Sequence, residues 1–96
     1  LVSLWRRAGE QAVAAPVPYK SNSGLPGVTF KRLNPGTRIR IFSTDGHLVQ
    51  TLNSEDGSNV LWNLKNVGGD KVSSGVYLYI LDGPGSKKEG KLVLIL

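Results

Sequence analysis

The segment Ser73-Ser74-Gly75, followed without interruption by six bulky residues from Val76 to Leu81, constrains the fold more than any other part of the sequence. Gly75 stands where a loop must turn sharply into a strand, a position that favours a residue able to adopt positive φ. An unbroken apolar run of this length is typical of a strand covered on both faces. The segment therefore predicts the last corner and the penultimate strand of a β-sandwich.

The rest of the chain alternates short apolar stretches with turn residues. Arg38 to Phe42 is followed by the turn Asp45-Gly46 and by Leu48 to Leu52, which together predict a β-hairpin. Twelve glycines and five prolines in 96 residues fit an all-β chain, so we predict a single immunoglobulin-like antiparallel β-sandwich of about seven strands over residues 16–96. We expect the apolar final strands to be central or covered. The expected structural core consists of Phe30, Ile39, Ile41, Trp62, Gly75, Tyr77 and Tyr79.

Residues 1–15 differ in character from the remainder. Leu1, Leu4, Trp5 and Ala12 recur at helical spacing, but an isolated helix this short is marginally stable in water. We expect an N-terminal arm or linker here, either a short helix or extended, and we hypothesise that Leu1, Leu4 and Trp5 contact this domain or a neighbour. A first residue other than methionine suggests a processed product or a fragment.

The residues that usually carry catalysis or metal binding are scarce. Cysteine is absent, and the single histidine, His47, follows the Asp45-Gly46 turn, which excludes thiolate and paired-histidine metal sites. The carboxylates fall at turns, where they serve local hydrogen bonding or solubility. A calcium site in the loop from Asn53 to Asn59 lacks EF-hand spacing, so a solvated loop is the simpler interpretation. We predict no catalytic residue, no cofactor and no metal, and hence no enzyme.

The net charge of +5 raises the question of an anionic partner. Arg38 and Arg40 alternate with Ile39 and Ile41, which places the arginines on the solvated face of a strand. No aromatic residues interleave the charges as a nucleic-acid stacking platform requires, so we predict no nucleic-acid binding and treat both arginines as candidate protein contacts. No apolar run approaches the roughly 18 residues that span a bilayer. Sugar binding through Trp5, Tyr19 or Tyr79 stays an alternative to their use in packing.

The order of these features resembles the flagellar hook-cap-type immunoglobulin-like domain, which is akin to the C-terminal sorting domains of the type IX secretion route. The resemblance covers about residues 16–96. Gly69 to Tyr77 closely matches the family pattern Gly-x-x-Val-x-Ser-Gly-Val-Tyr, and the hairpin turn Asp45-Gly46 precedes Leu48-Val49 as in the family. Two positions depart from it: Val17 replaces asparagine in the opening Pro-Asn-Pro motif, and Asn63-Leu64 replaces Asp-Gly after the tryptophan.

The resemblance implies a non-catalytic module of an exported bacterial protein, located outside the cell or on its surface. Our first hypothesis is a structural or interaction module that assembles with neighbours, even into a filament, through its N-terminal arm and edge strands. Its partner would be a second copy or a parent or neighbouring extracellular protein. The alternative is a C-terminal sorting or cell-surface anchoring domain of a larger secreted enzyme or adhesin.

Overall fold

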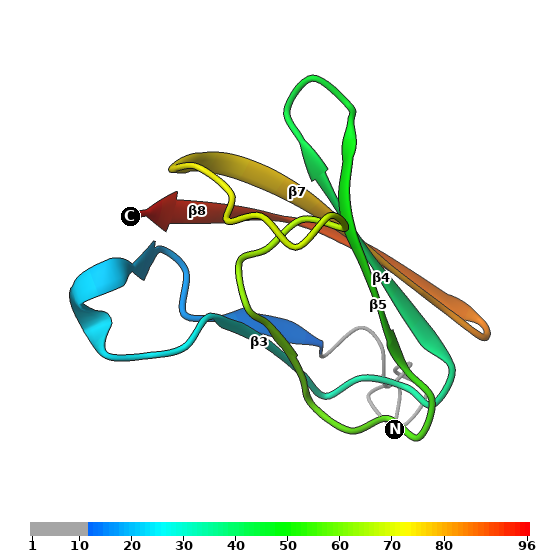
Figure 1. The fold of residues 1–96 in the computed structure, drawn as a ribbon. Coiled ribbons are helices and arrows are strands. Elements are labelled where there is room, and N and C mark those ends of the chain that lie inside the picture. Colours follow the sequence, from blue (N-terminus) through cyan, green and yellow to red (C-terminus); the bar gives the residue numbers. More distant parts are fainter. Residues whose placement is uncertain (1–11) are drawn as a thin grey trace.

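The computed structural model describes residues 12–96 and shows the predicted all-β sandwich, with two sheets packed face to face (Figure 1). One sheet has three strands in the order β1-β3-β6, and the other has five in the order β2-β8-β7-β4-β5. The strand bounds are β1 Val13–Ala15, β2 Tyr19–Lys20, β3 Val28–Lys31, β4 Thr37–Ser43, β5 Leu48–Ser54, β6 Val60–Trp62, β7 Gly75–Gly83 and β8 Ser86–Ile95. The helical structure in the described chain is a 3₁₀ turn over Ser21–Ser23.

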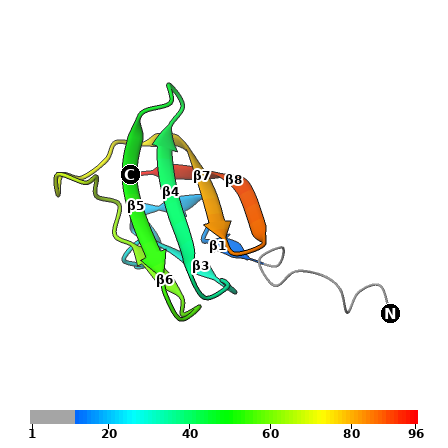
Figure 2. The same ribbon diagram turned by 90° about the vertical axis from the view of Figure 1, so that its right-hand side faces the viewer.

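The predicted hairpin is present as β4 and β5, joined by the Asp45-Gly46 turn. Strand β4 is flanked by β5 and β7, and β7 pairs with β8 through a second hairpin, so these four strands form most of the larger sheet (Figure 2). In immunoglobulin nomenclature β5, β4, β7 and β8 correspond to strands C′, C, F and G, and their order in the sheet is that of a variable-type immunoglobulin domain. All pairings are antiparallel except that of β2 with β8, which is parallel and departs from the purely antiparallel sandwich we predicted.

The first strands differ from the expected arm. Val13–Ala15, which we placed in the arm, pairs with β3, and Ala12 is buried. The chain then crosses to the other sheet through Pro16 and Pro18, both of which follow cis peptide bonds, and Tyr19 joins β8. The sandwich therefore begins a few residues before Pro16, because the backbone of this alanine-rich stretch completes the edge of the smaller sheet.

The core lies between the two sheets. Trp62 of β6 meets Tyr77 of β7 edge-to-face at a centroid distance of 5.8 Å, and Phe30 of β3 meets Tyr79 of β7 at 5.3 Å. Such aromatic pairs add to the burial of apolar area that stabilises the fold. Six of the seven residues expected in the core are buried: Phe30, Ile39, Ile41, Trp62, Tyr77 and Tyr79.

The seventh, Gly75, is exposed, so its assignment to the core is wrong. Its φ of +149° at the start of β7 shows that it serves the turn instead, since residues with a side chain rarely adopt this conformation. Directly after this turn, the Tyr77 hydroxyl donates a 2.7 Å hydrogen bond to the Ser73 carbonyl. A tyrosine near the start of strand F that bonds back to the preceding corner is a recurrent feature of immunoglobulin-like domains.

Candidate functional surfaces

The predicted contact residues fall into two groups. Leu1, Leu4 and Trp5 lie outside the described residues. Arg38 and Arg40 project from β4 on the outer face of the five-stranded sheet, the face turned away from the core. The Arg40 guanidinium lies 3.3 Å from the Asp82 carboxylate on β7, and both side chains are partly exposed. An exposed ion pair of this kind contributes only about 0–1 kcal/mol to the stability of the fold.

The outer face of this sheet divides into a charged and an apolar half. Register places Arg38, Asp82 and Lys87 in one row across β4, β7 and β8, and Arg40, Ile80 and Glu89 in the next. In the next row Phe42 and Leu78 lie beside Lys91, and in the last row Val76 lies beside Val93. We call the apolar side chains of this half, together with Ile80, the outer apolar patch; its members are Phe42, Leu48, Val76, Leu78, Ile80 and Val93.

The expectation that the apolar final strands are central or covered is confirmed in its first form, because β7 and β8 both lie inside the order of the larger sheet, but their outer face is not covered. Strand β7 is central in the sheet, yet Val76 is 43% exposed and Leu78 is 36% exposed. On the edge of β8 that faces away from β7, the described chain supplies only β2, which reaches no further than Leu94 and Ile95. The apolar side chains on both faces of residues 76–81 were the available sequence signal for this surface.

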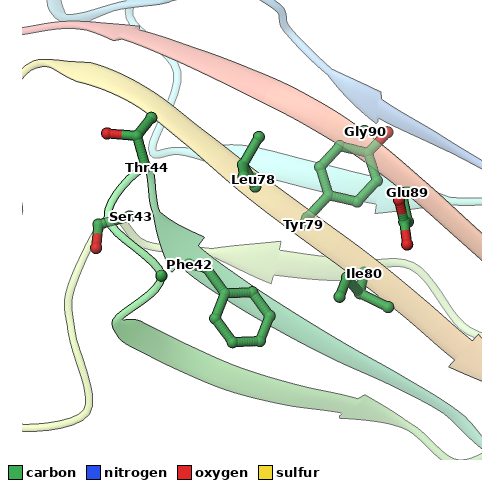
Figure 3. A pocket seen from close by; sticks show the side chains of 9 residues that line it. Phe42, Ser43, Thr44, Leu78, Tyr79, Ile80, Glu89 and Gly90 are labelled. Carbon is green, nitrogen blue, oxygen red and sulfur yellow. The ribbon is translucent and has the colours of Figure 1, made fainter.

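A hollow deepens the patch. It is lined by Phe42 of β4, Leu78 and Ile80 of β7 and Glu89 of β8, and its volume is about 280 Å³ (Figure 3). This is below the range of about 300–1,000 Å³ typical of drug-sized ligand pockets. A hollow of this size and apolar lining suits a protruding side chain of a protein partner.

The long edge strand β5 is partly closed to strand addition. The Val67 amide donates a 2.9 Å hydrogen bond to the Val49 carbonyl on this edge. The Gln50 side chain accepts a 3.0 Å bond from the Thr51 amide and donates a 3.1 Å bond to the Lys65 carbonyl of the neighbouring loop. Backbone groups that an incoming strand would need are thus already bonded, which is how natural sheets limit edge-to-edge association.

We expect Gln50→Ala to speed hydrogen exchange of the Thr51 amide by about fivefold, equivalent to the loss of a net hydrogen bond of ~1 kcal/mol. Gln50→Glu is the matched control, because its carboxylate keeps an acceptor for Thr51 while losing the donor to Lys65. Exchange measured by NMR should therefore stay slow in Gln50→Glu. Equal exchange rates at Thr51 in the two variants and the native protein would show that the Gln50 side chain does not close this edge.

The β4–β5 hairpin tip brings together the side chains of Ser43, Asp45 and His47. His47 Nδ1 lies 2.8 Å from the Asp45 carboxylate, and the Ser43 hydroxyl donates to the same carboxylate. These bonds, that from Ser43 first, lower the pKa of Asp45 to about 2. Because the serine bonds to the aspartate and not to the imidazole, the arrangement lacks the serine–histidine contact of a catalytic triad. Its hydrogen bonds stabilise a solvated turn.

The acidic loop after β5 is also organised by local bonds. The Ser58 amide donates a 3.0 Å hydrogen bond to Asp56, and the interaction with Ser58 lowers the pKa of that carboxyl group. Within residues 12–96, no three histidine, cysteine or acidic side chains are grouped so that they could hold a metal ion.

Tyr19 and Tyr79, the described aromatics considered for sugar binding, are buried in the core. In this part of the chain, no helix is long and apolar enough to cross a membrane.

Comparison with known proteins links the domain to bacterial secretion. No family model and no curated protein matches the chain. A solved structure of PorZ, an essential bacterial surface component of the type IX secretion system of Porphyromonas gingivalis, matches 91% of the chain with a TM-score of 0.77 and 27% sequence identity. The chain spans only 12% of PorZ, so it resembles one small domain of that larger surface protein.

A second match is to the dimeric latent form of PorU from the same bacterium. It covers 88% of this chain and 9% of PorU, with a TM-score of 0.62 and 22% identity. At this identity the likeness shows the fold alone. Of the resemblance seen in the sequence, the match to PorZ supports the relation to type IX proteins, whereas the flagellar hook-cap relation stays an expectation.

Proposed function

We propose that this chain is a non-catalytic domain of a larger exported bacterial protein, and that it sorts or anchors that protein at the cell surface through the type IX secretion route. The likeness to PorZ carries the proposal, because it covers nearly the whole chain yet only a small part of PorZ. A small domain of this kind within a much longer protein is consistent with one that sorts or anchors the protein to which it belongs.

The chemistry of the described residues supports a role without catalysis. Asp45 and His47 lie exposed at a hairpin tip, and Arg40 pairs with Asp82 on an open sheet face. General acid–base catalysis needs groups held within reach of a substrate and with pKa values suited to proton transfer, and Asp45 at about 2 is far from that condition. We place the host protein outside the cell or on its surface, with protein partners.

Assembly through edge strands, our first hypothesis from the sequence, has less support. The bonds of Val67 and Gln50 occupy two backbone groups of the β5 edge, the Val49 carbonyl and the Thr51 amide, and the edge strands of the smaller sheet, β1 and β6, have three residues each. Short or covered edges offer few free backbone groups for strand addition, which leaves the part of the β8 edge beyond its two-residue pairing with β2 as the longest edge without a partner strand in the described chain. The sorting and anchoring hypothesis does not depend on those edges.

A delivery assay tests the proposal. A reporter enzyme preceded by a signal peptide is joined to the N-terminus of residues 1–96 and expressed in Porphyromonas gingivalis with an intact type IX system and in a strain lacking it. We expect most of the reporter on the surface or in the medium of the intact strain only. The same reporter without the domain is the control and should stay inside the cell. Retention of the fused reporter in both strains would refute a sorting role.

A further inference from the structure

The outer face of the five-stranded sheet joins an apolar patch to a basic border. The exposed side chains Leu48, Val76 and Leu78 are 48%, 43% and 36% accessible, and they lie in adjoining rows of one sheet. Contiguous exposed apolar residues rimmed by polar ones mark interaction sites, whereas isolated ones need no explanation. The smaller sheet, whose strands have only three or four residues, exposes two large apolar side chains, Val13 and Leu61.

The charges around the patch have a clear sign. The same face has the basic side chains Lys20, Arg38, Arg40, Lys87 and Lys91, and the acidic ones Asp82 and Glu89. Asp82 is engaged by Arg40, and Glu89 is flanked along β8 by Lys87 and Lys91. The border of the patch is therefore basic, and a complementary surface must be acidic.

The positive charge of this border argues against two candidates for binding to the patch, a second copy of the chain and its N-terminal segment. A second copy would present the same basic border if the two outer faces met, and like charges opposed across an interface are unfavourable. Residues 1–11 include Arg6 and Arg7 against a single acidic residue, Glu10, so the N-terminal segment of the same or another copy is basic as well. We propose that the outer face binds a different protein surface, one with an apolar ridge flanked by carboxylates.

In this complex, a protruding apolar side chain of the partner fills the hollow between Phe42, Leu78 and Ile80. Carboxylates of the partner, on either side of this apolar side chain, lie opposite Arg38 in the charged half of the face and opposite Lys91, which is beside Leu78. Apolar anchors in pockets supply most of the affinity of such interfaces, and rim charges set the choice of partner and its orientation. The interface is independent of the secretion route, so failure of one proposal leaves the other intact.

Two synthetic helical peptides test the inference. They share one stripe of leucines, which glutamates flank in the first peptide and lysines in the second. Each is titrated into the isotope-labelled 96-residue chain and followed by NMR. We expect the glutamate peptide to shift the amide signals of Phe42, Leu78, Ile80 and Lys91, and to bind about tenfold tighter than the lysine peptide, as a few surface ion pairs would provide. Raised salt should weaken the preference.

Matched variants locate the site. Leu78→Thr should reduce binding of the glutamate peptide, whereas Leu61→Thr, the same change at a 43% exposed position on the other sheet, should not. A Lys87→Glu, Lys91→Glu double variant keeps the apolar patch and should favour the lysine peptide. Native spectra of the free variants establish that each is folded. The inference would be overturned if both peptides bind equally or if the peptide-induced shifts are confined to other surfaces. It would also be overturned if the patch signals shift with protein concentration in the absence of peptide, because a second copy would then be the occupant.

Discussion

Replacing Trp62 by alanine should lower the free energy of unfolding by about 3–5 kcal/mol, a large part of the about 5–15 kcal/mol typical of a small domain. The Trp62 side chain is fully buried and packs edge-to-face on Tyr77 across the two sheets. Alanine at this position removes those contacts and leaves a cavity that the surrounding strands fill only in part. Urea unfolding followed by far-ultraviolet circular dichroism measures the loss, without interference from the fluorescence of Trp5.

Leu61→Ala is the matched control for this prediction. Leu61 precedes Trp62 in the same strand but is 43% exposed, so its replacement should cost less than about 1 kcal/mol. Trp62→Phe separates packing from hydrogen bonding, because the indole Nε1 donates a 2.9 Å bond to the Lys65 carbonyl that phenylalanine cannot make. We expect its cost to fall between those of the other two variants. Similar losses for Trp62→Ala and Leu61→Ala would contradict a core centred on the tryptophan.

The β4–β5 hairpin was predictable because an alternation of polar and apolar residues is followed directly by a turn signal. Arg38 to Ile41 alternates basic and apolar residues, and the structure buries Ile39 and Ile41 while their neighbours face outward. The Asp45-Gly46 turn then fixes which residues of β5 oppose β4, since the loop of a hairpin sets its register. Local sequence was sufficient for this hairpin, because β4 and β5 follow each other along the chain; the pairing of β4 with β7 is not local.

The strands at the margins were not predictable in the same way. Val13–Ala15 is a strand only because β3 offers it an edge, and alanine has little intrinsic preference for extended structure. The polar first half of β8, from Ser86 to Gly90, has no alternation of apolar residues that would predict a strand, yet it pairs with β7 along its whole length. In both segments the pairing partner decides the structure.

The candidate surface was foreseen only in its charged half. Alternation placed Arg38 and Arg40 on the solvated face, and they lie there. The apolar half was missed because a run of apolar residues on both faces of a strand normally means that both faces are covered. Only the structure, in which the central strand β7 has Val76 and Leu78 exposed on its outer face, reveals that this face is uncovered in the described chain.

Gly27→Ala should destabilise the domain by about 3 kcal/mol or more, at or above the usual cost of overpacking. A Cβ atom at residue 27 would lie 2.0 Å from the Trp62 carbonyl oxygen and 3.3 Å from the Asn63 Cα. Both are backbone atoms, so no side-chain rotation can relieve the clash, and β3 must move away from β6 at the point where Val28 pairs with Trp62. Glycine is required here by the close approach of two backbones.

The same substitution at Gly68 provides the control. A Cβ atom there would meet only the side-chain oxygens of Asn66, at 3.4 Å, and Asp70, at 3.8 Å, which is ordinary contact. Its φ lies outside the positive range, so alanine should be neutral or should stabilise the protein by up to about 1 kcal/mol through a less flexible unfolded chain. Urea midpoints of the two variants give the comparison, and NMR shifts in β6 locate the displacement. If Gly27→Ala unfolds at the same urea concentration as Gly68→Ala, the contact between residue 27 and the Trp62 carbonyl does not constrain the fold.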